Sequence, residues 1–138
     1  MSKMKIYLCG SINGASDAVA KDWRNELKEK LSNEYDFLDP MDRDYRGVEL
    51  QNIEEIVTND LADIDSCDVV LYNFVKPSAG SAMEVFYAHR MTNKTVITVN
   101  SSGGVLSPWL VYHSHFVFDS MGKAINFLDI LEDSIDLK

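Results

Sequence analysis

Short apolar segments alternate with helical segments along the chain, and this alternation is the strongest constraint on its fold. Segments of strand character lie at residues 5–9, 35–38, 69–75, 95–99 and 116–118. Segments with apolar residues at helical spacing follow them, beginning near residues 17, 49, 81, 107 and 121. Strands that alternate with helices in this way pair in parallel through right-handed crossovers. At the first helix, Asp17 is expected to be the capping residue.

The alternation predicts a single domain spanning residues 1–138, of the α/β class. We expect a doubly wound, five-stranded parallel sheet with helices on both faces and the flavodoxin-like strand order 2-1-3-4-5. In that order, the carboxyl ends of the first and third strands border the crevice where such sheets bind ligands. The loop at residues 10–16 and the turn at residues 78–84 should therefore face each other.

Composition and charge exclude several classes of partner. The net charge of −9 argues against binding to nucleic acid or to an anionic membrane. No apolar run reaches about 18 residues, so no transmembrane helix is expected. The chain enters its first strand without room for a signal peptide, which predicts a cytoplasmic protein. In that compartment Cys9 and Cys67, which lack CxxC spacing, are interpreted as buried thiols.

Candidate reactive groups are few, and each has a structural alternative. Glu84 stands in an apolar setting near the start of the third helix, but a glutamate there can also simply favour the helix dipole. Asp60 lies on an apolar helix face, where an acid is unusual, whereas Asp63 is expected to be a solvated or helix-end charge. The hydroxyl of Tyr7 could reach the site or be satisfied in the core. His113 and His115 would point two rings to one side of an extended segment, but no third ligand stands at metal spacing, so no metal site is expected.

The two loops that follow the first and third strands are candidate anion sites. Backbone N–H groups near Gly10 and the Ser11 hydroxyl could cradle a phosphate, although a tight turn explains these residues equally well. Ser78 could serve the same end or only close its turn. A receiver-type phosphoacceptor is disfavoured, because Cys9 and Asn73 stand where that fold needs acids.

Four segments taken together resemble the nucleoside 2-deoxyribosyltransferase superfamily: IYLCGSI at 6–12, NDL at 59–61 leading into DVV at 68–70, PSAGSAME at 77–84 and SGGVLS at 102–107. The nearer branch is that of the 2′-deoxynucleoside 5′-monophosphate N-hydrolases and CMP N-glycosidases. The resemblance implies three catalytic residues. Glu84 would attack the anomeric carbon, Tyr7 would orient Glu84, and Asp60 would hold the sugar hydroxyls or protonate the departing base.

The resemblance also implies how the substrate is held. Ser78 stands where nucleoside-using transferases have an aspartate, and a serine can donate to a 5′-phosphate that an aspartate would repel. Ser107 would reach the substrate across a subunit interface, which implies a homodimer or larger homo-oligomer. Asn13 replaces an arginine common in the branch, and Arg43 or Arg46 is the hypothesised replacement. The expected substrate-binding residues are Gly10, Ser11, Asn13, Arg43, Arg46, Ser78, Gly80 and Ser107.

The leading expectation is hydrolysis of the N-glycosidic bond of a (deoxy)nucleoside 5′-monophosphate through a covalent glycosyl ester on Glu84. Three alternatives stay open. One is base exchange on unphosphorylated deoxynucleosides, and another is a nucleotide-binding module without catalysis. The third, flavin binding, would need stacking aromatic residues that these loops lack. No cofactor is expected, and the base is not determined.

Overall fold

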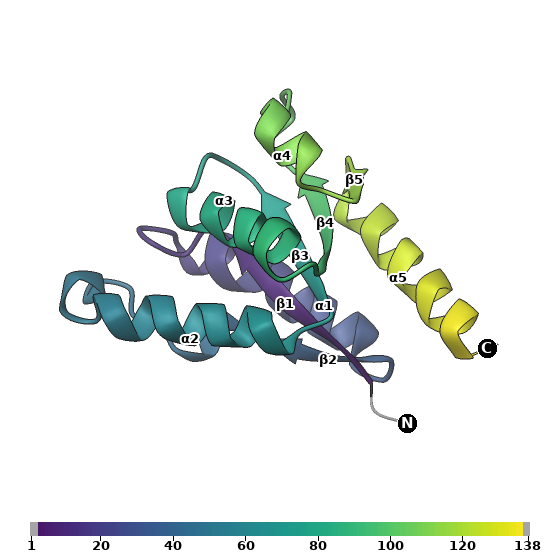
Figure 1. The fold of residues 1–138 in the computed structure, drawn as a ribbon, viewed down its shortest axis with the longest axis horizontal. Coiled ribbons are helices and arrows are strands. Elements are labelled where there is room, and N and C mark those ends of the chain that lie inside the picture. The colour runs from purple at the N-terminus through teal and green to yellow at the C-terminus, as the bar shows by residue number, and fades with distance from the viewer. Residues whose placement is uncertain (1–2, 137–138) are drawn as a thin grey trace.

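The computed structural model describes residues 3–136 and shows one five-stranded sheet between two layers of helices (Figure 1). The strands are β1 (Met4–Gly10), β2 (Tyr35–Leu38), β3 (Val69–Phe74), β4 (Thr95–Asn100) and β5 (Phe116–Phe118). All pair in parallel, in the order β2-β1-β3-β4-β5. The predicted fold class and strand order are therefore confirmed.

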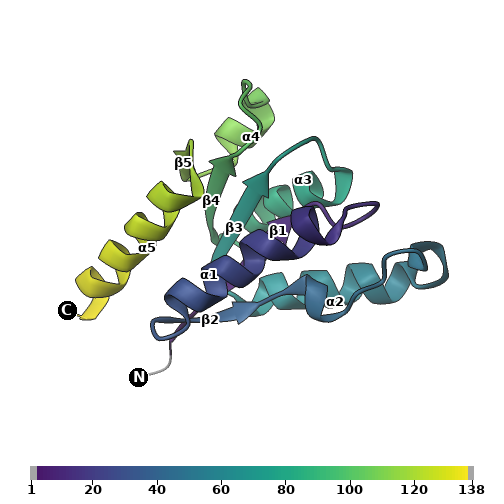
Figure 2. The same cartoon turned by 180° about the vertical axis from the view of Figure 1, so that it is seen from behind.

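Five α-helices cover the sheet: α1 (Trp23–Leu31), α2 (Ile53–Ser66), α3 (Ala79–Phe86), α4 (Pro108–Tyr112) and α5 (Met121–Asp136). Helices α1 and α5 lie on one face, which Figure 2 shows toward the viewer, and α2 and α3 lie on the other. A π-helical turn precedes α1 (η1, Ala18–Asp22) and another continues α3 (η4, Tyr87–Met91). Two 3-10 turns, η2 (Pro40–Asp42) and η3 (Glu49–Gln51), connect β2 to α2. None of the helices within residues 3–136 is long and apolar enough to span a membrane.

Strand β1 contributes to both cores, because successive side chains of a strand point to opposite faces. Ile6 and Leu8 pack into the core beneath α1 and α5. Tyr7 and Cys9 pack into the core beneath α2 and α3. All four side chains are fully buried. The polar atoms of Tyr7 and Cys9 are thereby carried to the face where α3 lies.

A buried arginine anchors the end of β1. The Arg24 guanidinium donates to the carbonyl oxygens of Leu8 and Gly10, at 3.2 Å from Nη2 to each, and pairs with Asp39 at 3.5 Å. A Cβ added at Gly10 would lie only 2.8 Å from the Trp23 ring, so only glycine fits there. Apolar periodicity gives no signal for Arg24, which holds in place the point where the Gly10 loop begins.

The capping residue at the first helix was predicted wrongly. Asp17 has helical backbone angles (φ −57°, ψ −39°) and makes no capping hydrogen bond, whereas a cap needs an extended backbone. The Ser16 hydroxyl instead accepts the N–H of Val19 at 3.3 Å. The carboxylate of Asp17 is drawn away by Arg46, 2.7 Å distant.

Helix α2 packs over only part of its length. It begins at Ile53, after the η3 turn, rather than at about Glu49 as predicted. The apolar residues at its start are exposed, Ile53 by 58% and Val57 by 50%, whereas Ile64 near its end is fully buried. Figure 1 shows the amino-terminal half of α2 projecting past the strands, which explains why its apolar stripe is only partly covered.

Candidate active site

Glu84, in the second half of α3, is held by two donors from β1. The hydroxyl of Tyr7 donates to Glu84 Oε2 at 2.8 Å, and the thiol of Cys9 donates to Oε1 at 3.4 Å. Both donors are fully buried, whereas Glu84 is partly exposed. The carboxyl group is thus oriented by two donors from the strand beneath it. The residues alone left open whether Tyr7 reaches the site or is satisfied in the core, and the contact of Cys9 was not predicted, although the two residues are i and i+2 on one strand.

Asp60, on α2, brings a second carboxyl group to the site. Its side chain lies within hydrogen-bonding reach of Glu84. Behind it, Arg43 Nη2 contacts Asp60 Oδ1 at 3.2 Å and Asp63 Oδ2 at 2.7 Å. Asp63 lies in the last turn of α2, in line with a helix-end charge, but it is not solvated, because its side chain is only 20% exposed and is paired with Arg43. The two acids singled out from the sequence do meet in the fold.

The environment raises the pKa of both carboxyl groups. Burial, and then the charge of Asp60, raise the pKa of Glu84 to about 8. Burial also raises the pKa of Asp60, although Arg43 opposes the shift. Two carboxyl groups this close hold one proton between them until the pH rises well above that of an isolated acid. Near neutral pH the pair can therefore present one carboxylate and one carboxylic acid, which is the requirement for nucleophilic attack assisted by a general acid.

Ser11, directly after β1, carries a buried hydroxyl with no partner. The residue is 6% exposed, and Ser11 Oγ makes no hydrogen bond within residues 3–136. Buried polar atoms are normally paired, so an unpaired hydroxyl at the end of a strand indicates a place for a ligand. Asn13, two residues on, is exposed, and Gly14 takes the left-handed backbone (φ +69°) that turns the loop.

Ser78 caps α3. Its hydroxyl oxygen accepts the N–H of Ser81 at 3.4 Å, and its proton is donated to Ser81 Oγ at 3.1 Å. This is the structural role that a serine before a helix commonly has. Gly80, in the first turn of α3, is exposed and has no atom within 4 Å of a Cβ built on it. Free N–H groups in such a turn attract anions.

The two arginines expected to bind phosphate are already paired with acids. Arg43 contacts Asp60 and Asp63, as described above. Arg46 binds the carboxylates of Asp17 and Asp44, both at 2.7 Å, and its hydrogen bonds to Asp44 lower the pKa of that carboxyl group to about 2. A further bond from Arg46 to the carbonyl oxygen of Ala15 ties the 39–47 loop to the Gly10 loop.

Ser107 lies apart from this group within one chain. It caps α4, where Ser107 Oγ accepts the N–H of Trp109 at 3.2 Å and Pro108 takes the first helical position. The residue is exposed, and among residues 3–136 it makes no hydrogen bond to Glu84, Tyr7 or Asp60.

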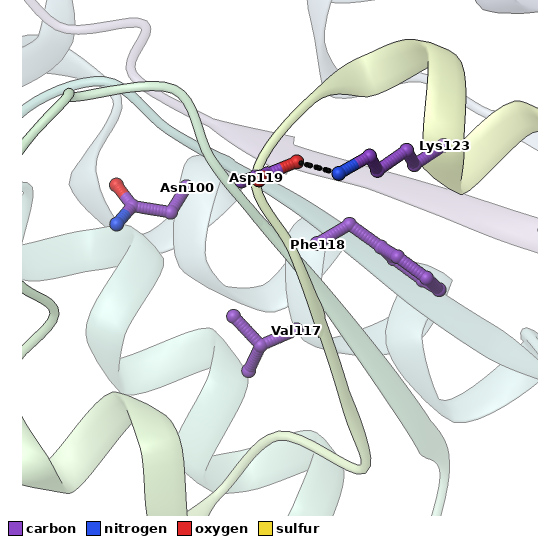
Figure 3. A pocket seen from close by; sticks show the side chains of 5 residues that line it. All are labelled: Asn100, Val117, Phe118, Asp119 and Lys123. Carbon is purple, nitrogen blue, oxygen red and sulfur yellow. Dashed lines mark ion pairs between the residues drawn. The ribbon is translucent and has the colours of Figure 1, made fainter.

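A shallow pocket of about 320 Å³ lies elsewhere on the molecule (Figure 3). It is lined by Asn100, Val117, Phe118, Asp119 and Lys123. Its two charged side chains, Asp119 and Lys123, pair with each other at 2.8 Å. No residue of the Glu84 group borders this pocket, and it offers no reactive group of its own.

The three histidines are neighbours. The ring of His89 lies 5.2 Å from that of His113 and 4.8 Å from that of His115, between ring centres. The sequence pattern paired only His113 with His115. Within residues 3–136 no group of histidine, cysteine, aspartate or glutamate side chains is arranged to hold a metal ion.

A family model described as nucleoside 2-deoxyribosyltransferase like matches residues 3–102. The chain belongs to this family. The membership was predicted from four short segments and is confirmed. The matched range contains Tyr7, Asp60 and Glu84, whereas Ser107 falls outside it. Among curated proteins, none matches the sequence.

Solved structures of similar fold include two enzymes of this kind. The 2-deoxyribosyltransferase of Bacillus psychrosaccharolyticus superimposes with a TM-score of 0.72 at 18% identity, covering 88% of this chain and 90% of that one. The CMP N-glycosidase BcmB of Clostridium botulinum gives 0.61 at 16% identity, covering 91% and 98%. At such identities the likeness shows the fold alone. The N-terminal domain of the nisin resistance regulator NsrR shares it too, with a TM-score of 0.56 at 11% identity and coverages of 94% and 97%.

Proposed function

We propose that this family member hydrolyses the N-glycosidic bond of a nucleoside or deoxynucleoside 5′-monophosphate, releasing the free base and the sugar 5-phosphate. The observation that carries the proposal is that the carboxyl groups of Glu84 and Asp60 lie within hydrogen-bonding reach of each other, with Tyr7 donating to Glu84. The fold shared with a CMP N-glycosidase supports it.

In the proposed reaction, the pair first places its proton on Asp60, which leaves Glu84 ionised. The Glu84 carboxylate forms a bond to the anomeric carbon as the bond to the base nitrogen breaks. The departing nitrogen keeps the bonding electrons and takes the proton of Asp60. Water then attacks the anomeric carbon of the glycosyl ester and gives a proton to Asp60, and Glu84 leaves as a carboxylate. Attack by a second base instead of water would make the same site a transferase.

Three features support a phosphate on the substrate. The unpaired hydroxyl of Ser11 is a donor without a partner, at the end of β1. The first turn of α3 offers N–H groups beside Ser78, where an aspartate would repel an anion. Lys76 stands exposed on the same turn and forms no ion pair with the residues of the described chain. Since Arg43 and Arg46 are already paired, we assign the phosphate to this turn and Ser11 rather than to those arginines.

The second candidate is deoxyribosyl transfer between bases on unphosphorylated nucleosides. The higher TM-score with a 2-deoxyribosyltransferase favours it. So does the capping role of Ser78, because its hydroxyl is already engaged by Ser81.

A panel of ribo- and deoxyribonucleoside 5′-monophosphates, each compared with its unphosphorylated nucleoside, tests the proposal. We expect free base from at least one monophosphate, with kcat/KM at least about tenfold above that of its nucleoside, since one hydrogen-bonded charge contributes about 1.5–3 kcal/mol. Chromatography with mass detection measures both products. Preference for nucleosides together with exchange onto an added base would establish the second candidate, and no release from any compound would contradict both.

We also propose that the enzyme is a homodimer in which Ser107 completes the site of the partner. Around α4 the side chains of Val105, Trp109 and Tyr112 are exposed by 98%, 72% and 67%. Apolar groups gathered on one exposed surface are typical of a protein interface.

Mixing variants within one dimer tests this arrangement. Ser107→Ala and Glu84→Gln chains, each weakly active or inactive alone, should regain about a quarter of wild-type activity when coexpressed, because one site in each mixed dimer is intact. Coexpressed Asp60→Asn and Glu84→Gln chains form no intact site and serve as the control. A monomer by sedimentation, or no recovery in the mixed dimers, would overturn the proposal.

A further inference from the structure

Strand β1 presents two hydrogen-bond donors to Glu84, and the proposed reaction uses only Tyr7. Tyr7 and Cys9 are two residues apart, so both side chains emerge on the face covered by α3. Each contacts a different oxygen of the same carboxyl group, Tyr7 at Oε2 and Cys9 at Oε1. Donors on both oxygens fix the plane of the carboxyl group as well as its position.

The thiol of Cys9 is suited to donate and unsuited to react. Burial, and then the charge of Glu84, raise the pKa of this thiol well above its usual value. It therefore stays protonated at neutral pH, and its proton lies between Glu84 Oε1 at 3.4 Å and the carbonyl oxygen of Ser81 at 3.7 Å. A thiol is a weak donor, so the oxygen it contacts keeps more of its nucleophilic character than one bound by a hydroxyl.

We propose that Cys9 is a positioning residue for the nucleophile, holding Glu84 Oε1 ready for attack while Tyr7 holds Oε2. The inference rests on the proposed reaction of Glu84, and it adds a residue that acts through Glu84 rather than on the substrate. The other groups that face Glu84 are Tyr7 on β1 and Asp60 on α2, with Arg43 beyond Asp60.

The chain offers a matched control. Cys67 is the second free cysteine; it is 1% exposed and packs in the same core as Cys9, yet its hydrogen bonds do not involve Glu84. Cys67→Ala therefore removes a buried thiol without removing the contact. Cys9→Ala removes the contact, and Cys9→Ser keeps a donor of similar size, so it also tests the idea if Cys9→Ala fails to fold.

The decisive readout is the titration of Glu84, followed by carbon NMR in protein labelled at glutamate carboxyl carbons, with the signal assigned by its loss in Glu84→Gln. Loss of a donor destabilises the carboxylate, so Cys9→Ala should raise the pKa of Glu84 by roughly 0.5 to 1. Cys9→Ser should restore the titration or shift it to lower pH, and Cys67→Ala should leave it unchanged. An unshifted titration in Cys9→Ala, or an equal shift in Cys67→Ala, would overturn the proposal.

Kinetics on the released base give the second readout. In Cys9→Ala the basic limb of the plot of kcat/KM against pH should move to higher pH, and kcat/KM should fall by roughly 3- to 30-fold. Cys9→Ser should recover most of that loss in kcat/KM. Because the NMR titration needs no substrate, the two proposals can fail separately. Absence of base release with a shifted titration would leave the positioning role standing and remove the proposed function. Base release without a shifted titration would leave the proposed function standing and remove the positioning role of Cys9.

Discussion

Replacing Glu84 by glutamine should abolish base release, lowering kcat by about ten-thousand-fold or more. The amide has nearly the same shape and can still accept from Tyr7, but it cannot form the glycosyl ester. Quenched reactions of the wild-type enzyme should in addition contain protein carrying one sugar phosphate, detected by intact-protein mass spectrometry and located to Glu84 after digestion.

Two further variants make this result specific. Glu29→Gln, an exposed glutamate on α1, changes charge equally and should leave kcat unchanged. Glu84→Ala with added azide should regain part of the rate and yield a glycosyl azide, because the small anion replaces the missing nucleophile. Base release by Glu84→Gln at more than about a hundredth of the wild-type rate would contradict a covalent role for Glu84.

Glu84→Gln should also stabilise the folded chain at high pH. A measured gain in stability would show at the same time that the variant is folded. The pKa of Glu84 is about 8 in the folded chain, against 4.5 for a free side chain. Between these values the folded state holds a proton that the unfolded state has released. The stability that Glu84 contributes to the folded chain is therefore complete below pH 4.5 and is lost as the pH rises through 8. One pKa unit corresponds to about 1.4 kcal/mol, so thermal unfolding at pH 9 should show the variant more stable by up to about 5 kcal/mol, and near parity below pH 4.5.

Replacing Asp60 by asparagine should lower kcat/KM by about a hundred- to a thousand-fold and change the pH profile. In the wild type, kcat/KM should fall above about pH 8, where the pair loses its shared proton. Asp60→Asn removes the second carboxyl group, so the pKa of Glu84 should fall and the basic limb should disappear. The fall in kcat/KM caused by Asp60→Asn should be smaller for a substrate whose base carries an electron-withdrawing group, because that base departs without full protonation.

Asp63→Asn is the matched control for this prediction. Asp63 lies one helical turn from Asp60 on α2 and shares Arg43 with it. Its removal should change kcat/KM by less than about threefold and leave the basic limb in place. If Asp60→Asn kept the basic limb, or if both variants lost activity equally, the acid role of Asp60 would be wrong.

The architecture could be predicted because its signals are local. Strands 35–38 and 116–118 were predicted with the bounds that the structure has, since short β-branched and aromatic runs between helical segments leave few alternatives. Element ends were less predictable: the η3 turn delays the start of α2, and Ser16 replaces Asp17 as the cap. These ends depend on backbone angles and on pairing with distant side chains such as Arg46.

The site was only partly predictable for the same physical reason. Tyr7, Asp60 and Glu84 were singled out because polar groups on apolar faces are unusual, whereas Cys9 on an apolar strand is indistinguishable from an ordinary core residue. Its contact with Glu84 joins residues 75 positions apart. The pairing of Arg43 with Asp60 depends on the path of the 39–47 loop, which has no periodic pattern to predict it.

By itself, the sequence determined the α/β class and the family, because periodicity and short motifs are properties of the chain alone. It suggested the strand order without fixing it, and pairing in the sheet decided that order. Only the tertiary structure decided that Tyr7 and Cys9 each hold one oxygen of Glu84, and that Asp60 lies close enough to keep a proton on the pair. Those facts depend on burial and on distances between β1, α2 and α3, which the packing of the sheet creates and no local pattern contains.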